Sequence, residues 1–159
     1  GAQAIHGAAA LSRNGANLTV TTQNGAGTGH SAINWQSFNV PGGSTTHFAQ
    51  PNAASTSINR VLGNNPSAIF GTLSSNGRLV LVNPSGIAVG AGAVVDTAGF
   101  TASTLRMSDA DALAGRMRFG QDGLGGGSLS VQGRVVARGG DVVLIAPQID
   151  TGAQAVVQA

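Results

Sequence analysis

The side chains that could do chemistry in this chain are few and widely separated. Three histidines occur, His6, His30 and His47, and the gaps of 24 and 17 residues between them exclude the short spacing of a metal-binding motif. The chain has no cysteine, lysine or glutamate, so cysteine-based metal sites and lysine chemistry are excluded as well. We therefore expect the histidines to lie on the surface or at caps, and we predict no metal site.

The motifs of common catalytic and nucleotide-binding sites are also missing. No Gly-x-Ser-x-Gly nucleophile elbow occurs, and a phosphate-binding P-loop would need a lysine. Gly25–Gly29 has the glycines of a dinucleotide-binding loop without its spacing. Asp109 and Asp111 could pair as a carboxylate dyad, but helix capping accounts for both, and they offer too few oxygen ligands for calcium.

These absences disfavour catalysis. A sugar-cleaving enzyme built on repeated β-strands needs carboxylates placed across a groove, whereas the six aspartates here are dispersed. The chain is thus predicted not to be an enzyme and to need no cofactor.

The composition limits the partners further. Of the 159 residues only 9% are charged, and eight arginines against six aspartates give a net charge of +2. A nucleic-acid-binding domain clusters its basic residues, whereas these arginines are scattered from Arg13 to Arg138, so no nucleic-acid partner is expected. The longest apolar runs, Leu79–Val82 and Val142–Pro147, are far shorter than the about 20 residues that span a membrane. Neither membrane insertion nor a signal peptide is predicted.

The sequence otherwise reads as a succession of short strands. Gly, Asn, Asp or Pro follows nearly every run within a few residues. Phe38–Val40 is out of phase with Ile33–Trp35, which indicates a bulge or corner between them. The remaining runs are Leu18–Val20, Leu79–Val82, Ile87–Val89, Ala93–Val95, Phe100–Thr104, Leu129–Val131, Val135–Ala137, Val142–Ala146 and Ala155–Val157.

Such strands can build a sandwich, a barrel or a β-solenoid. A sandwich prefers longer strands with clean alternation. The second half of the chain instead repeats a unit of glycine, one charged residue and two apolar residues, at 77–80, 133–136 and 140–143. Imperfect repeats of strand and tight turn favour stacked parallel coils, so we predict a β-solenoid.

One segment departs from the strand pattern. Ser108 followed by Asp111 has the form of a capping box, and Gly115 can end a helix. We therefore predict one or two helical turns at 109–115 and a flexible glycine-rich loop at 120–127.

The most specific motifs lie in the centre of the chain. They read Ile-Asn-Trp-Gln-Ser-Phe-Asn-Val at 33–40, Phe-Ala-Gln-Pro at 48–51, Ser-Ile-Asn-Arg-Val at 57–61, Ile-Phe-Gly-Thr-Leu at 69–73, Asn-Gly-Arg-Leu-Val-Leu-Val-Asn-Pro-Ser-Gly-Ile at 76–87 and Gly-Phe-Thr-Ala-Ser-Thr-Leu at 99–105. In this order they resemble the N-terminal secretion (TPS) domain of two-partner secretion exoproteins. This is the filamentous-haemagglutinin-like domain of large Gram-negative adhesins, haemolysins and contact-dependent toxins, and the resemblance covers nearly the whole chain.

The resemblance implies an all-β fold, a right-handed parallel β-helix with an N-terminal cap and extra-helical strands, as one domain over residues 1–159. It also implies a partner, an Omp85-type outer-membrane transporter that recognises the domain in the periplasm through POTRA domains. The expected function is secretion targeting of a large, adhesin-like, secreted or surface exoprotein of a Gram-negative bacterium, with the domain nucleating β-helix folding during export. Strand-like sequence at 154–159 with no polar cap is expected to continue into that larger exoprotein. The alternative is an adhesive module that binds host glycan or matrix through the β-helix surface.

The family's Asn-Pro-Asn-Gly motif falls on Asn83, Pro84, Ser85 and Gly86, with serine at the third position. These residue types suit a type I turn that corners the chain between two strands. Two interpretations stay open: the segment only folds the helix, or it also contacts the transporter.

Secondary candidates lie in the two motifs before it. Asn65 and Pro66 are a loose echo of a second family motif, Asn-Pro-Asn-Leu, and Asn59 and Arg60 belong to the Asn-Arg-Val pattern. Arg60 is expected to cover apolar surface, and Trp35 to pack in the core or cap rather than stack on a sugar.

Overall fold

The computed structural model describes residues 1–120 and 126–159, and three sheets contain all the strands of these residues. The six-stranded sheet consists, in spatial order, of β1 (Ala2–His6), β4 (His30–Trp35), β6 (Thr56–Val61), β9 (Arg78–Val82), β12 (Gly99–Ser103) and β15 (Val142–Ile145). The seven-stranded sheet consists of β2 (Ala8–Asn14), β3 (Asn17–Gln23), β5 (Thr45–Ala49), β8 (Thr72–Ser75), β11 (Val94–Thr97), β14 (Arg134–Ala137) and β17 (Val156–Gln158). The four-stranded sheet consists of β7 (Ser67–Ile69), β10 (Ile87–Val89), β13 (Leu129–Val131) and β16 (Ile149–Thr151).

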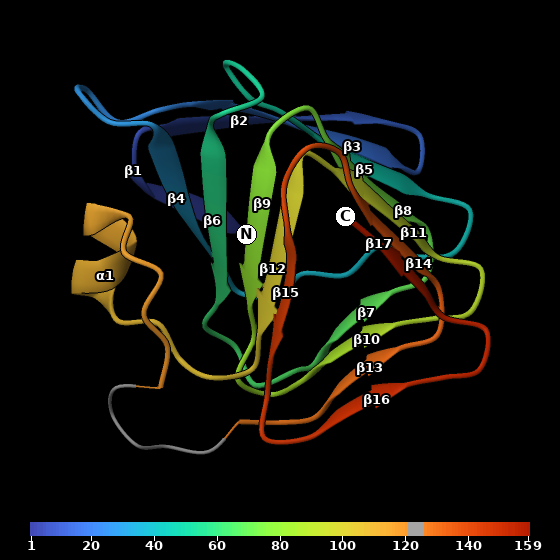
Figure 1. Ribbon diagram of the computed structural model, residues 1–159. Helices are drawn as coiled ribbons and strands as arrows, with labels where there is room; N and C mark the ends of the chain where they lie inside the picture. The colour runs from blue at the N-terminus through green and yellow to red at the C-terminus, as the bar shows by residue number, and fades with distance from the viewer. Residues whose placement is uncertain (121–125) are drawn as a thin grey trace.

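The chain visits the three sheets in turn, and each circuit adds one parallel strand to each sheet. β10, β11 and β12 form one coil, and β13, β14 and β15 form the next coil (Figure 1). Register partners in successive coils are 20 to 22 residues apart, as in Ser67↔Ile87 and Thr72↔Val94. The predicted parallel β-helix is confirmed.

The core lies between the three sheets and is built from side chains that recur at the same place in each coil. Leu73, Val95 and Val135 occupy one register position of β8, β11 and β14, and each is at most 1% exposed. Alternation along a strand sends every second side chain inward. In β9, for example, Leu79 and Leu81 join the core while Val80 and Val82 face outward.

Antiparallel strands cover the N-terminal end of this helix. β1 pairs antiparallel with β4, and β2 pairs antiparallel with β3 through the turn at 15–16. The predicted N-terminal cap is therefore confirmed, although neither of its two strands was located from the sequence.

An insertion of about twenty residues interrupts the coil spacing between β12 and β13, where the register partners Val94 and Arg134 are 40 residues apart. It contains α1 (Asp109–Ala114), which lies outside the six-stranded sheet in Figure 1. The prediction of helical turns at 109–115 is confirmed, since Gly115 ends the helix in the left-handed conformation. The loop predicted at 120–127 falls mostly on residues 121–125, which lie outside the described residues.

The outward side chains of the six-stranded sheet make a second, smaller cluster beneath this insertion. Met107 and Ala112 pack there against Ile58 and Val80, and all four are at most 5% exposed. At six residues, α1 is too short to cross a membrane, and no other helix occurs in the described ranges.

The out-of-phase run at Phe38–Val40 is a corner and not a strand. β4 ends at Trp35, and Val40 makes a single parallel bridge to Ile69 of the next coil. Phe38 turns inward and meets the ring of Trp35 edge-on, with the ring centroids 5.0 Å apart. Trp35 is 5% exposed, so its predicted packing role is confirmed.

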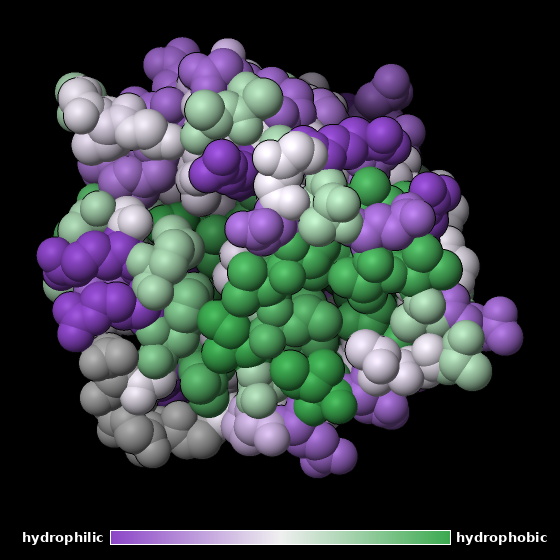
Figure 2. Space-filling view, in the orientation of Figure 1, coloured by the Kyte–Doolittle hydropathy of each residue, from purple (hydrophilic) through white to green (hydrophobic). Residues whose placement is uncertain are grey.

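Apolar surface gathers on the face of the last coil. Val143 of β15, Ile149 of β16, and Val156 and Val157 of β17 are each 40–44% exposed. Figure 2 shows this hydrophobic area turned toward the viewer.

Candidate functional site

The segment Asn83–Gly86 forms the corner between β9 and β10. The Gly86 N–H donates to the Asn83 carbonyl at 3.0 Å, which closes a four-residue turn, and the Ser85 N–H donates to Asn83 Oδ1 at 3.0 Å. Gly86 has a φ of +130°, which a side chain would strain. The predicted cornering turn is present, and glycine at its fourth position has a physical reason.

The Asn83 side chain is fully buried and ties this corner to the preceding coil. Its Nδ2 donates to the Asn65 carbonyl and to Ser67 Oγ, both at 2.9 Å. The structure thus brings the secondary candidate Asn65 to the main motif, but through its backbone. Pro66 also lies there, because its Cβ is 3.6 Å from the point where a Gly86 Cβ would stand.

The following coil closes on the other side of the turn. The Gly127 N–H donates to the Pro84 carbonyl at 2.7 Å. A Cβ on Gly127 would stand 2.5 Å from the Ser85 carbonyl oxygen, so only glycine fits this approach. The turn is therefore held between two corners, and the side chains of Pro84 and Ser85 are its partly exposed groups.

Arg60 and Asn59 point to opposite sides of β6. Asn59 is buried inside the β-helix, where its Oδ1 accepts from Trp35 Nε1 at 2.9 Å. Arg60 points outward and donates to the Met107 carbonyl at 2.9 Å, and to Asp109 Oδ1 at 2.7 Å. It also donates to Asn34 Oδ1 at 2.9 and 3.1 Å.

The expectation that Arg60 covers apolar surface is therefore wrong. Its side chain is 6% exposed, against 84% for that of Asp109, so Arg60 is a buried cation with hydrogen-bond partners on β4 and on the insertion. A guanidinium has five N–H groups in a planar fork and can serve several acceptors at once. Arg60 thereby joins the insertion to the six-stranded sheet.

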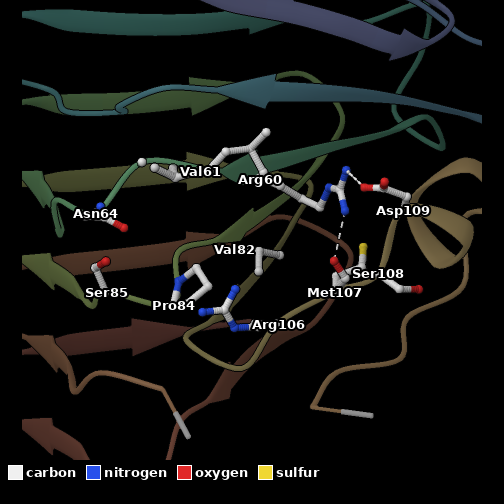
Figure 3. Close-up of a pocket in the computed structure, with 12 residues that line it drawn as sticks. Arg60, Val61, Asn64, Val82, Pro84, Ser85, Arg106, Met107, Ser108 and Asp109 are labelled. Atoms are coloured by element: carbon white, nitrogen blue, oxygen red, sulfur yellow. Dashed lines mark hydrogen bonds and ion pairs between the residues drawn. The ribbon is translucent and has the colours of Figure 1, made fainter. Parts of the chain in front are cut away.

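A cavity of about 410 Å³ opens between the insertion and the two corners. Its floor is apolar and its rim is polar; the lining residues are 60–64, Val82, Pro84, Ser85 and 106–109. Figure 3 shows Pro84 and Arg106 on one side and the Arg60–Asp109 ion pair on the other. Leu62 on the rim is 60% exposed, an unusual position for a leucine.

The insertion's wall of this cavity is held by helix capping. Ser108 Oγ accepts from the Asp111 N–H at 3.1 Å, which is the predicted N-cap. Asp111 is buried, and a hydrogen bond from Arg116 Nε at 2.8 Å lowers the pKa of its carboxyl group. Asp109 and Asp111 are thus each paired with an arginine and do not form a carboxylate dyad.

The cavity has the chemistry of a binding surface. Its lining holds one carboxylate, Asp109, already paired with Arg60, and no histidine. A polar rim around an apolar floor suits an apolar side chain of a partner, with main-chain groups of that partner on the rim. Within residues 1–120 and 126–159 no three metal-ligating side chains come together.

Of the residues predicted from sequence, Pro84, Ser85 and Arg60 line this cavity, Asn83 and Asn65 shape it from behind, and Asn59 lies on the far side of the sheet. Sequence reasoning missed Leu62 and Arg106. A signal for Leu62 was available, since it is a large apolar residue that follows a strand and precedes Gly63 at a corner.

Comparisons with known proteins agree with this architecture. The family model of the TPS secretion domain matches residues 3–159. The crystal structure of the HMW1 secretion domain from Haemophilus influenzae superposes with a TM-score of 0.86 at 29% identity, over 99% of this chain and 41% of that chain.

Two curated relatives, both from Haemophilus influenzae, are described as heme/hemopexin-binding protein. One is 36% identical over 104 residues, which is 65% of this chain and 11% of the relative's length. The other is 38% identical over 78 residues, 49% of this chain and 8% of its length. The chain thus spans about a tenth of the length of these relatives.

Proposed function

The chain belongs to the TPS secretion domain family, and from this membership we propose that an Omp85-type outer-membrane transporter recognises it through periplasmic POTRA domains. TPS domains direct exoproteins of Gram-negative bacteria into two-partner secretion, working with a transporter partner. The domain would serve as the N-terminal secretion signal of a larger, adhesin-like exoprotein that reaches the medium or the cell surface. The much greater length of its curated relatives supports this proposal.

The observation that carries the proposed site is the cavity beside the Asn83–Gly86 turn. Buried Asn83 and the tightly packed Gly86 have structural roles, which leaves Pro84 and Ser85 to meet a partner. Exposed Leu62 stands on the same rim and offers an apolar anchor. We therefore assign recognition to Pro84, Ser85 and Leu62, with Asn83 and Gly86 holding the turn in shape.

The coil structure supports a role in folding during export. Each coil buries the apolar face of the previous one, so folding can propagate from the capped N-terminal end. The chain has no cysteine, so no disulfide can form in the periplasm and block its passage. We propose that this domain nucleates the β-helix of the exoprotein as it emerges.

The paired carboxylates support a role other than catalysis. Asp96 is bound by Arg138 at 2.7 Å, which lowers the pKa of its carboxyl group. With Asp109 and Asp111 also held by arginines, three of the six aspartates are committed to ion pairs. A general acid needs the opposite, a carboxyl group with a raised pKa.

The test is export of the chain, fused to a cleavable export signal, from cells with and without a two-partner transporter of the same operon. We expect secretion only with the transporter. Leu62→Ser and Ser85→Arg should each lower secretion about tenfold, the usual effect of losing one anchor contact. Leu11→Ser and Ser12→Arg on β2 change the same residue types at exposed positions away from the cavity and should leave it unchanged.

Circular dichroism and protease resistance of the purified variants confirm that each one folds. Equal secretion without the transporter would refute the proposed partner, and glycan-array binding would then favour the adhesive alternative. Equal loss in the cavity and β2 variants would refute the proposed site and leave the partner standing.

A further inference from the structure

Two histidines far apart in the sequence are stacked where the N-terminal cap meets the inserted helix. His6 ends β1 and His30 begins β4, and their ring centroids lie 4.1 Å apart with 21° between the ring planes. His30 is only 8% exposed, so the expectation of a surface histidine is wrong for this residue, whereas that of a cap position is right. The stack plays no part in the cavity described above.

Hydrogen bonds define where each neutral ring carries its proton. His30 Nε2 lies 3.2 Å from the Ala112 carbonyl oxygen and 3.1 Å from that of Leu113. Because carbonyls only accept, His30 Nε2 is the donor, and it ties the C-terminal end of α1 to β4. His6 Nε2 lies 3.0 Å from Thr28 Oγ1, whose own proton goes to a backbone carbonyl at 2.7 Å, so His6 Nε2 also donates.

The charged groups on the neighbouring elements are already paired with one another. On α1, Asp109 pairs with Arg60 of β6, and buried Asp111 pairs with Arg116, which follows the helix. Arg118 lies 3.9 Å from Asp111 as well. β1 and β4 carry no charged side chain besides the two histidines. No unpaired carboxylate on these elements stands ready to offset a second imidazolium charge.

The stack therefore accepts one proton more readily than two. The pKa of His6 is lowered, first by burial and second by the charge of His30. A chain in which the rings have separated binds two protons at the ordinary histidine pKa of about 6.5. The stabilisation from the stack is thus complete above about pH 6.5 and declines as the pH falls below that value.

We propose that the His6–His30 stack is a pH-sensitive latch, which fastens α1 to the capped end of the β-helix at neutral pH and releases it on acidification. The latch is a property of the fold and stands apart from the transporter proposal. One consequence does rest on the proposed function. Met107 and Asp109, on the N-terminal side of α1, wall the cavity, so release would loosen that wall.

The test is hydrogen–deuterium exchange of the whole 159-residue chain, at about pH 7 and about pH 5, corrected for intrinsic rates. Amides of α1 and β1 should exchange about tenfold faster at the lower pH, relative to those of β10 and β11 in the core. His30→Gln keeps an N–H donor toward the helix carbonyls without titrating, and His6→Phe keeps a ring on His30 without a charge. Both variants should lose the acid response.

His47→Gln is the matched control, because His47 bonds to Ser74 Oγ on the seven-stranded sheet and should leave the acid response intact. Exchange at α1 that is independent of pH, or an acid response that persists in His6→Phe, would overturn the latch. Should a variant fail to fold, an NMR titration of the two rings in the unaltered chain decides the matter. Two separated steps support coupling, and two independent, ordinary titrations refute it.

Discussion

Replacing Asn83 with alanine removes a side chain that is fully buried and makes three hydrogen bonds. Two go from Nδ2 to the Asn65 carbonyl and Ser67 Oγ at 2.9 Å, and one comes to Oδ1 from the Ser85 N–H at 3.0 Å. Each contributes about 1 kcal/mol to the free energy of unfolding. We expect the variant to lose about 3 kcal/mol, because alanine offers no replacement partner inside the corner.

Urea unfolding measures this loss, followed by the fluorescence of Trp35, the one tryptophan of the chain. The midpoint should fall while the denaturant dependence of the free energy stays unchanged. Asn64→Ala is the matched control, since Asn64 lies exposed at the neighbouring corner and should change the stability by less than about 0.5 kcal/mol. Equal midpoints for the two variants would refute a structural role for Asn83 and make the motif a contact site throughout.

A second substitution at Asn83 separates hydrogen bonding from shape. Asn83→Asp retains an acceptor for the Ser85 N–H but turns a carboxylate toward the Asn65 carbonyl oxygen. Burial raises the pKa of such a carboxyl group above its unfolded value. Relative to the unaltered chain, the loss of stability should therefore be greatest at neutral pH and shrink as the pH falls through that raised pKa. A loss independent of pH would contradict this account.

Three further substitutions test other parts of the framework by thermal or urea unfolding. Ser108→Ala should cost about 1 kcal/mol through loss of the N-cap, and an unchanged midpoint would contradict that role. Arg60→Met should cost about 3 kcal/mol, because it leaves buried acceptors unpaired, while Asp109→Asn at the exposed end of the same pair should cost less than about 1 kcal/mol; similar losses would place the energy in the ion pair instead. Gly71→Ala places a Cβ 2.2 Å from a backbone carbonyl of the preceding coil and should cost more than about 3 kcal/mol, whereas Gly29→Ala, with nothing within 4 Å, should be nearly neutral; equal effects would refute the tight coil packing.

Strands whose apolar residues alternate could be located from sequence alone. Ile87–Val89 and Leu129–Val131 agree with β10 and β13 in both bounds. The cap strands β1 and β2 could not be located, because Ala2–His6 and Ala8–Asn14 are rich in alanine, which gives no strand periodicity. They are strands because the first coil offers unpaired edges at β4 and β3.

The candidate site was predicted in part. The turn at Asn83–Gly86 follows from its residue types, because proline, glycine and a side chain that bonds its own backbone define a corner locally. The contacts of Arg60 follow from coil length, since the register Asn34↔Arg60 is set only once two coils are stacked. The part played by Asn65 was beyond sequence reasoning, because its backbone carbonyl is the group that is used.

The cavity walls come from residues 60–64, 82–85 and 106–109, which lie in separate coils and in the insertion. An extended chain holds these segments tens of ångströms apart, so the surface does not exist until at least two coils and the insertion have assembled. A partner that binds there measures the folded state of the domain and not its sequence. A linear peptide containing Asn83–Gly86 would accordingly be a poor competitor, however faithfully it copied the motif.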